Sequence, residues 1–329
     1  MWIVLYQRPV MLGQMLVGKI SKISILKHGR WGVRVSLPSG LMENVSVFLI
    51  VKTIPFALLI LKQEIKVVTD IIPLIDGDIL RYEIGFAAET GWREITKEQD
   101  NIPPFHYVEN ILLSRLDWIN NQIETKADPI IYLTEGKTFR YDLAKTKPYK
   151  GTRIDKRPWH FKNLTVYIRD VLGAEIITEI EADDAMSIRQ VSEPDKYIIC
   201  SRDKDLRQVP GWFYSWELGR QPSFGPIKIL SEGTIELADN HKKLIATGLA
   251  AFYGQVLTGD RVDNIPGLDK CGPVAAYNML KDNQHEWLDI VKDAYNDDDL
   301  LLEQGRLCWM TRRLHENGSP VLWEIGMEE

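Results

Sequence analysis

Residues 69–80, TDIIPLIDGDIL, decide the fold class of this chain of 329 residues. A short apolar run stops at Asp76-Gly77, which is the pattern of a buried strand that ends in a turn. The aspartate therefore lies at the carboxyl end of the expected strand. In parallel α/β sheets, this is the edge at which functional sites form.

The same pattern returns further along the chain. Residues 197–205, YIICSRDKD, place Asp203 and Asp205 after an apolar run, and Glu135 follows another short apolar run. Because the carboxyl ends of parallel strands meet at one edge, we expect these acids to lie close to Asp76.

Segments with helical spacing alternate with these strands. Apolar residues recur at helical intervals over 108–123, 164–172 and 183–190, and residues 174–178 form a further short apolar run. Strands that alternate with helices predict an α/β fold with a central, mostly parallel sheet flanked by helices. We assign residues 68–240 to this core.

The pattern changes in the last part of the chain, residues 241–329, which we assign to a separate helical part. An apolar helix is expected at 244–257, and a loop rich in Gly, Pro and Asp follows at 259–272. A second helix is expected at 273–280, because its proline suits the first helical turn. A last helix is expected at 300–314.

The first 67 residues form a leader of different composition. It contains nine Lys and Arg residues but only two acidic residues, Glu43 and Glu64. Its apolar run at 45–61 contains Lys52 and Pro55. This run is too short and too interrupted for a transmembrane helix.

Three interpretations of the leader stay open. Weak alternation at 19–35 favours a small β-rich module, and the apolar run favours a membrane or partner anchor. The abrupt start of the acidic pattern at Ile71 favours a true start near Val67 or Val68, which is the interpretation we prefer. We expect no membrane partner for residues 68–329.

Composition narrows the class of protein. A net charge of −6 and 45% hydrophobic residues describe a globular chain without an overall basic field, so any DNA-binding charge must be local. Cys200, Cys271 and Cys308 are widely spaced. They form neither a disulfide framework nor a zinc motif, which favours the reducing cytoplasm.

Carboxylates concentrate in four segments: IDGD at 75–78, EADD at 181–184, SRDKD at 201–205 and GDRVDNIPG at 259–267. Each alone is more often a turn or a helix cap. Together with Glu135 they offer many oxygen ligands, which Mg²⁺ prefers. Two Mg²⁺ ions can hold the attacking hydroxide and the leaving oxygen of a phosphoryl displacement.

The EADD, S-x-D-x-D and GDxxDNIPG strings, in this order, resemble the 5′→3′ exonuclease and flap endonuclease family. That family includes the 5′-nuclease domain of DNA polymerase I and phage exonucleases, and the phage branch is the closer likeness. The resemblance covers residue 70 to the C-terminus. It implies a PIN-like core followed by a helix–hairpin–helix DNA-binding part.

The resemblance also implies a set of metal ligands, with the assignment of each acid to one ion left open. The first of two Mg²⁺ ions would be surrounded by Asp76, Glu135, Glu181, Asp183 and Asp203. The second region would contain, partly through water, Asp184, Asp205, Asp260 and Asp263. Mn²⁺ would substitute for Mg²⁺. The family mostly has Asp at the position of Glu135, and it has a polar non-ligand at Asp78, which we leave out.

A basic stretch runs into an arch-like helical segment expected at 145–172. By resemblance, Lys150 and Arg153 would reach the scissile phosphate, and Arg140 and Tyr149 would contact DNA. Fixed positive charge stabilises the transition state of phosphoryl transfer, which is the physical reason for such a pair.

The loop after the first C-terminal helix resembles the hairpin of a helix–hairpin–helix element. Gly267 and Gly272 would let the backbone approach DNA phosphates, and the helix that starts at Pro273 suits anion binding. The family often holds a K⁺ ion in this loop.

The function implied by the resemblance is that of a Mg²⁺-dependent 5′→3′ exonuclease or structure-specific 5′ nuclease. Its partners would be DNA with free 5′ ends, nicks or flaps, or an RNA–DNA hybrid, in replication or recombination. A phage-encoded enzyme would act in the cytoplasm of the bacterial host. Two alternatives stay open: a catalytically inactive DNA-binding protein of the same fold, and a PIN-like ribonuclease.

Overall fold

The computed structural model describes residues 71–98, 101–154, 156–282 and 284–327, together with four strands nearer the N-terminus. The chain divides into two compact units, Met1–Thr69 and Asp70–Glu329. The α/β and helical parts that we expected on either side of residue 240 lie within the second unit. Among the described residues, no helix combines the length and apolar character needed to cross a membrane.

The N-terminal unit contains an antiparallel sheet in the order β1-β2-β3-β4. Its strands are β1 (Trp2–Leu5), β2 (Leu16–Leu26), β3 (Arg30–Ser36) and β4 (Val47–Val51). The alternation at 19–35 thus falls on β2 and β3. The expected start near residue 68 stays a prediction, and residues 52–70 lie outside the described part.

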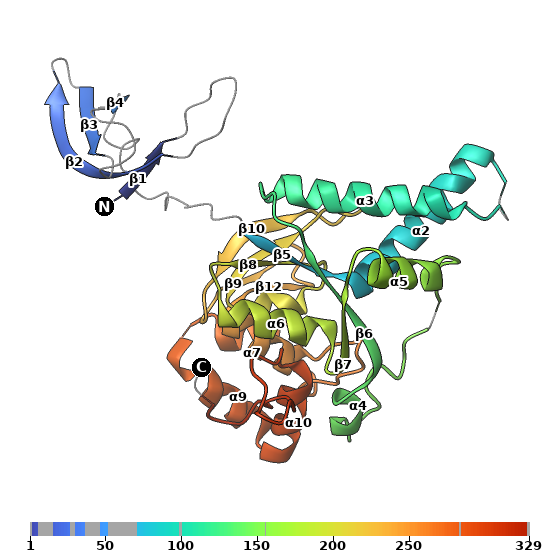
Figure 1. Ribbon diagram of the computed structural model, residues 1–329. Helices are drawn as coiled ribbons and strands as arrows, with labels where there is room; N and C mark the ends of the chain where they lie inside the picture. The colour runs from blue at the N-terminus through green and yellow to red at the C-terminus, as the bar shows by residue number, and fades with distance from the viewer. Residues whose placement is uncertain are drawn as a thin grey trace. The chain divides into compact units, whose positions relative to one another are not determined.

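The second unit is built on a sheet of six strands in the order β10-β9-β8-β5-β6-β7 (Figure 1). The central strands are β5 (Ile72–Asp76), β6 (Ile130–Thr138), β7 (Glu175–Glu179), β8 (Tyr197–Cys200) and β9 (Gly211–Ser215). These five run parallel, and β10 (Phe224–Ile229) is antiparallel to β9. The predicted mostly parallel sheet is confirmed.

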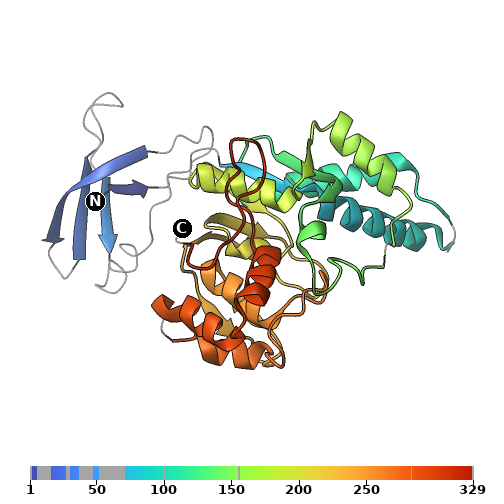
Figure 2. The same ribbon diagram turned by 90° about the horizontal axis from the view of Figure 1, so that it is seen from below.

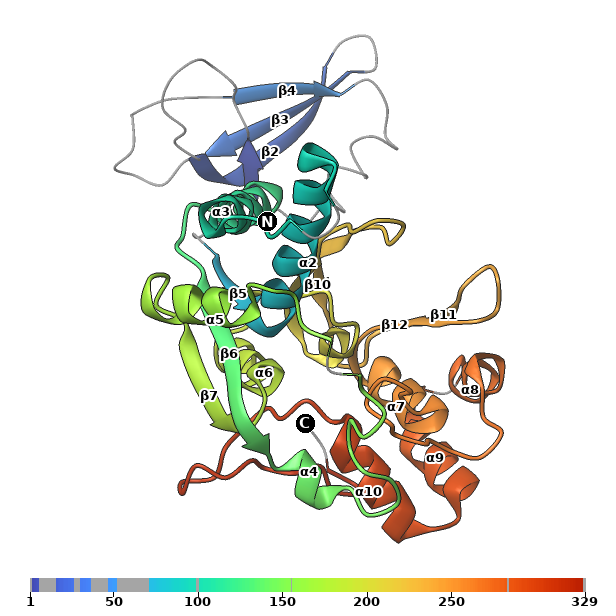
Figure 3. The same cartoon turned by 90° about the vertical axis from the view of Figure 1, so that its right-hand side faces the viewer.

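Helices cover both faces of this sheet (Figures 1 and 3). Helices α2 (Gly77–Thr96), α3 (Phe105–Gln122) and α5 (Phe161–Asp170) share one buried core with the sheet, and α6 (Ala182–Ser192) shares another. Burial on both faces explains why β5 and β8 are continuous apolar runs.

The C-terminal part is helical, apart from a hairpin formed by β11 (Ile235–Leu237) and β12 (Leu244–Ala246). Its helices are α7 (Gly248–Thr258), α8 (Pro273–Leu280), α9 (Trp287–Tyr295) and α10 (Asp298–Cys308) (Figure 2). The first predicted helix therefore begins late, because residues 244–246 pair as a strand. The last one ends at Cys308 instead of residue 314.

The predicted arch-like helical segment at 145–172 is only partly helical. Its helix is α5, and the short helix α4 (Arg140–Leu143) precedes it, whereas the described residues between them form turns and extended chain. Pro148 and Pro158 lack the N–H that a helix needs. Lys150 adopts a left-handed conformation, with φ of 53°, and donates its N–H to the Asp263 carbonyl at 2.9 Å. Tertiary hydrogen bonds therefore replace helical ones here.

Candidate active site

Most of the predicted acids line one cleft at the carboxyl edge of the sheet, with a volume of about 960 Å³. Asp76 ends β5, Asp203 follows β8, and Glu181 and Asp183 open α6. The acids in the cleft wall are Asp76, Asp78, Glu135, Glu181, Asp183, Asp203, Asp205 and Asp263. The topology thus brings together side chains from five separate stretches of sequence.

Asp76 is fixed at the bottom of this acid cluster and is only 1% exposed. One oxygen caps α2 by accepting from the Ile79 N–H at 2.9 Å, and the other accepts from the Ser201 hydroxyl at 2.8 Å. Burial, and then the charge of Asp78, raises the pKa of Asp76 to about 6.

Asp183 and Asp203 carry the strongest signs of crowding. Burial raises the pKa of Asp183 well above its usual range, and the charges of Asp76 and Asp203 raise it further. Burial, and then Asp205, raises the pKa of Asp203 to about 8. Negative charge in this part of the cleft therefore exceeds the positive charge available to it.

This donor set suits a hard divalent cation. Every donor is an oxygen, and closely spaced carboxylates with raised pKa values are stabilised by a nearby cation. Within the described part of the chain, no group of three or more His, Cys, Asp or Glu side chains is already arranged to hold a metal ion.

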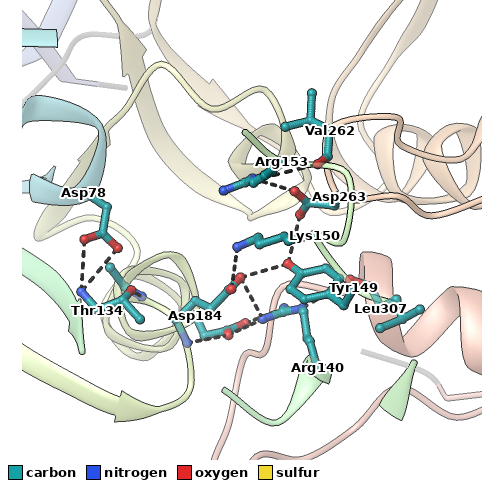
Figure 4. Close-up of polar contacts among 12 residues, drawn as sticks. Asp78, Thr134, Arg140, Tyr149, Lys150, Arg153, Asp184, Val262, Asp263 and Leu307 are labelled. Atoms are coloured by element: carbon teal, nitrogen blue, oxygen red, sulfur yellow. Dashed lines mark hydrogen bonds and ion pairs between the residues drawn. The ribbon is translucent and has the colours of Figure 1, made fainter. Parts of the chain in front are cut away.

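A hydrogen-bonded chain joins the basic turn to the acids (Figure 4). The Lys150 ammonium donates to Glu181 at 2.5 Å, and the Tyr149 hydroxyl lies 3.1 Å from Glu181 and 2.9 Å from Asp263. Arg153 donates to the other Asp263 oxygen at 2.5 Å. Burial opposes the charge of Lys150, but Glu181 and Asp263 outweigh it and raise the pKa of Lys150. Lys150 therefore stays cationic at the cleft.

The acids predicted for the second metal region are already paired with cations of the chain. The Lys204 ammonium bridges Asp260 at 2.7 Å and Asp205 at 3.0 Å. The Gln255 amide donates to Asp205 at 2.7 Å. Burial raises the pKa of Asp260, but Lys204 outweighs it and holds that pKa below its usual value. Sequence reasoning overlooked Lys204, which lies inside the SRDKD string itself.

The structure corrects two predicted roles, DNA binding by Arg140 and metal binding by Asp184. Both residues are 0% exposed, and neither lines the cleft. Asp184 accepts from two Arg140 nitrogens at 2.6 and 2.8 Å, from the Thr311 N–H at 2.9 Å and from the Glu181 N–H at 3.1 Å. Arg140 therefore cannot contact DNA, and a direct metal ligand at Asp184 does not fit this geometry.

Gly267 is a further correction. It is buried, and its N–H donates to the Gln304 side chain at 3.1 Å, so this amide is not free to bind a phosphate. Its φ is +69°, and a Cβ atom there would lie 2.3 Å from the Gly259 nitrogen. Glycine is needed here for close packing within the loop. Gly272 is exposed at the start of α8, so its DNA-binding role stays a prediction.

Three remaining residues complete the comparison with the sequence. Glu135 is exposed and lines the cleft, so its role as a metal ligand stays a prediction. Tyr149 is buried and its hydroxyl is bonded to Glu181 and Asp263, so its contact with DNA stays a prediction. Asp78, which we left out, lies in the cleft and accepts from the Thr134 N–H at 3.2 Å and from Arg81 at 2.7 Å.

Cationic side chains also line the cleft on α2, α5 and the turn before α5. They are Arg81, Arg157, Lys162 and Arg169. Phe161 lies among them, with the guanidinium groups of Arg81 and Arg157 4.5 and 4.8 Å from its ring centre. The cleft thus combines acids at its base with cations on its wall, which suits a polyanion that meets a metal centre.

Comparisons with known proteins agree with the fold. No model of a known family matches the sequence, and no curated protein matches it significantly. A bacteriophage T5 flap endonuclease, solved as a pseudo-enzyme–product complex with DNA and metal ions, is 16% identical. Its TM-score is 0.51, over 72% of this chain and 88% of its own.

Two further structures show weaker likeness. The T5 5′-exonuclease with bound zinc is 17% identical, with a TM-score of 0.48 over 72% of this chain and 88% of its own. The catalytic core of Rad2 in complex with a DNA substrate is 14% identical, with a TM-score of 0.42 over 78% of this chain and 84% of its own. The T5 flap endonuclease confirms the predicted fold class, which is that of the 5′→3′ exonucleases and flap endonucleases.

Proposed function

We propose that this protein is a divalent-metal-dependent nuclease that hydrolyses phosphodiester bonds near the 5′ ends of DNA. The observation that carries the proposal is the meeting of Asp76, Asp183 and Asp203 in one cleft, within reach of the charge of Lys150. Crowded acids with raised pKa values are typical of functional sites, because their arrangement costs stability.

The chain's own cations would orient the substrate. Lys150 lies beside the acids and Arg153 lies near the solvent-exposed rim, so a phosphate between them would meet positive charge on one side. Neither side chain needs to transfer a proton, because positive charge alone stabilises the oxygens of the transferred phosphoryl group. The left-handed backbone at Lys150 and its bond to Asp263 hold this cation in place.

Two Mg²⁺ ions, or Mn²⁺ in their place, are our proposal for the cofactor. Asp76, Asp183 and Asp203 would hold the first ion, and Asp205 and Asp260 the second once Lys204 moves aside. When bound, such ions supply a hydroxide nucleophile and stabilise the leaving oxygen. A K⁺ ion in the 259–272 loop belongs to the same proposal and rests on the resemblance alone.

The cationic wall of the cleft suits a DNA strand entering from a free 5′ end, a nick or a flap. We extend the proposal to the 5′ strand of an RNA–DNA hybrid, and to replication or recombination in the cytoplasm of a phage-infected bacterium. The acids at Asp76, Asp183 and Asp203 favour this activity over an inactive DNA-binding protein, which would have no use for their crowding.

The test uses the full chain with labelled nicked, flapped and blunt duplexes, in Mg²⁺ and in EDTA. We expect short products released from 5′ ends in Mg²⁺ only. Asp183→Asn should abolish cleavage and still bind DNA, whereas Asp239→Asn, on an exposed loop, should behave as the wild type. DNA binding without cleavage in Mg²⁺ would support the inactive alternative, and cleavage of RNA alone would support the ribonuclease.

A further inference from the structure

Residues 308–312, which are the last residue of α10 and the four that follow it, form a buried segment. Cys308, Trp309, Met310 and Thr311 are each at most 6% exposed. The segment has no acid of its own, yet its backbone hydrogen-bonds to elements that carry the acids of the cleft. The segment therefore contacts the elements of the site as well as the helical core.

The first connection runs through the buried Arg140–Asp184 pair. Arg140 donates to the Trp309 carbonyl at 2.7 Å and to the Leu307 carbonyl at 3.2 Å. Asp184 accepts from the Thr311 N–H at 2.9 Å. The pair thus holds the backbone of the segment at Trp309 and at Thr311.

Asp184 also shapes the start of α6. Its oxygen accepts from the Glu181 N–H, and the two residues form a reciprocal capping box. Such a box sets the first turn of a helix. Because Glu181 and Asp183 belong to this turn, their positions depend on where Arg140 holds Asp184.

The second connection runs through Gln208, at the end of the short helix Asp205–Gln208. Its amide donates to the Cys308 carbonyl at 3.0 Å and accepts from the Met310 N–H at 3.1 Å. Arg312 donates to the Gln208 carbonyl at 3.0 Å. The loop that carries Asp203 and Asp205 is therefore tied to the same five residues as α6.

We propose that Arg140, Asp184, Gln208 and residues 308–312 form a C-terminal brace that sets the α6 acids and the Asp203 loop at a fixed separation. Arg140, Asp184 and Gln208 are positioning residues, since none of these three side chains lines the cleft, whereas Cys308 and Met310 of the segment do line it. A metal site tolerates displacements of only about 0.5 Å in its supporting groups, which is why such a brace matters. The link to metal binding rests on the proposed function, whereas the structural link does not.

If Asp184 belongs to the brace, neutralising it should destabilise the metal-free protein. If Asp184 were instead a crowded metal ligand, neutralising it should stabilise that protein. An acid crowded by like charges destabilises the fold, so its neutralisation stabilises the protein. An acid paired with a buried guanidinium does the reverse, because its neutralisation leaves a buried charge without a partner. Asp203 is an acid crowded by like charges, whereas the geometry makes Asp184 an acid paired with a buried guanidinium.

The first experiment measures thermal unfolding of the full chain in EDTA. Asp184→Asn should lower Tm by about 6 °C or more, as expected for a broken buried pair in a protein of this size, whereas Asp203→Asn should raise it. Arg140→Met should lower Tm similarly, and the double variant Arg140→Met/Asp184→Leu should recover part of that loss. An Asp184→Asn protein that melts above the wild type would overturn the brace.

The second experiment separates positioning from plain stability. Gln208→Leu is compared with Gln190→Leu, because Gln190 is an equally buried glutamine that bonds to Ile199 and Pro210 instead. Both variants should lose stability. Only Gln208→Leu should weaken Mn²⁺ binding, about tenfold, as measured by electron paramagnetic resonance on the folded protein at low temperature.

Equal Mn²⁺ affinity in the two glutamine variants would overturn the positioning role. The brace and the nuclease proposal fail separately. A wild type that binds Mn²⁺ and follows the expected Tm signs, but cuts no DNA, would support the brace and contradict the nuclease.

Discussion

Replacing Asp203 by asparagine should stabilise the metal-free protein. Asparagine has nearly the same shape and keeps an oxygen for the hydrogen bond that Asp203 accepts from the Asp205 N–H at 2.9 Å. The substitution therefore removes one charge from the cluster and leaves local geometry intact. Destabilisation, the usual result of changing a half-buried residue, is not expected here.

The magnitude follows from the pKa of Asp203, which rises from 3.8 to about 8 on folding. At pH 7 the unfolded side chain has lost its proton and the folded one retains it. Taking up that proton costs ~1.4 kcal/mol for each pH unit between 3.8 and 7, or about 4 kcal/mol as an upper limit. Water and side-chain relaxation reduce such penalties, so we expect a gain of about 1–3 kcal/mol.

The assay is urea unfolding in EDTA at pH 7, followed by circular dichroism, with Asp239→Asn as the exposed control. Added Mg²⁺ should reverse the order, because a ligand that binds the folded state more tightly stabilises it more, and Asp203→Asn would bind Mg²⁺ less tightly. If Asp203→Asn were no more stable than the wild type in EDTA, the acids would not be crowded and the argument for a cation site would fail.

Three further predictions test other parts of the site. Lys150→Ala should slow single-turnover cleavage about 10²-fold while DNA affinity changes little, and exposed Lys147→Ala should be neutral; equal rates would return Lys150 to an ordinary surface cation. The stability of the metal-free wild type should fall as pH rises from about 4 towards 8, because Asp76 and Asp203 have pKa values of about 6 and 8 when folded and hold protons that the unfolded chain releases. Urea titrations across this range would contradict it by showing a flat or rising profile. Lys204→Met should strengthen Mn²⁺ binding several-fold, since it frees the two acids that the ammonium bridges, and an unchanged affinity would show that this lysine does not compete with metal.

The sequence predicted those features that depend on short patterns. Apolar runs located β5 and β8, and the acids directly after them meet in the cleft because parallel strands end at one edge. Helical periodicity likewise located α3 and α5. Helix α2 was missed, because Gly77 to Thr96 is amphipathic with modest contrast and begins in what resembles a turn.

The sequence did not predict which side chains pair with each other inside the fold. Asp183 and Asp184 are adjacent acids of one string, but a helical turn directs the first into the cleft and the second into the protein interior. Arg140 lies in a basic stretch, and only the fold reveals that its neighbours are buried carbonyls and a carboxylate. Charge runs describe average exposure, whereas a single buried member depends on long-range contacts.

The acids of the site differ in whether a cation of the chain neutralises them. Among the acids in and around the cleft, Asp184, Asp260 and Asp263 are paired with cations of the chain, whereas Asp183 and Asp203 are crowded by like charges. Pairing engages the carboxylate oxygens, so a paired acid binds a metal only after its cation moves aside, as proposed for Asp260 and Lys204. The crowded acids therefore mark where an external cation gains most, and the paired ones hold the framework that keeps them close.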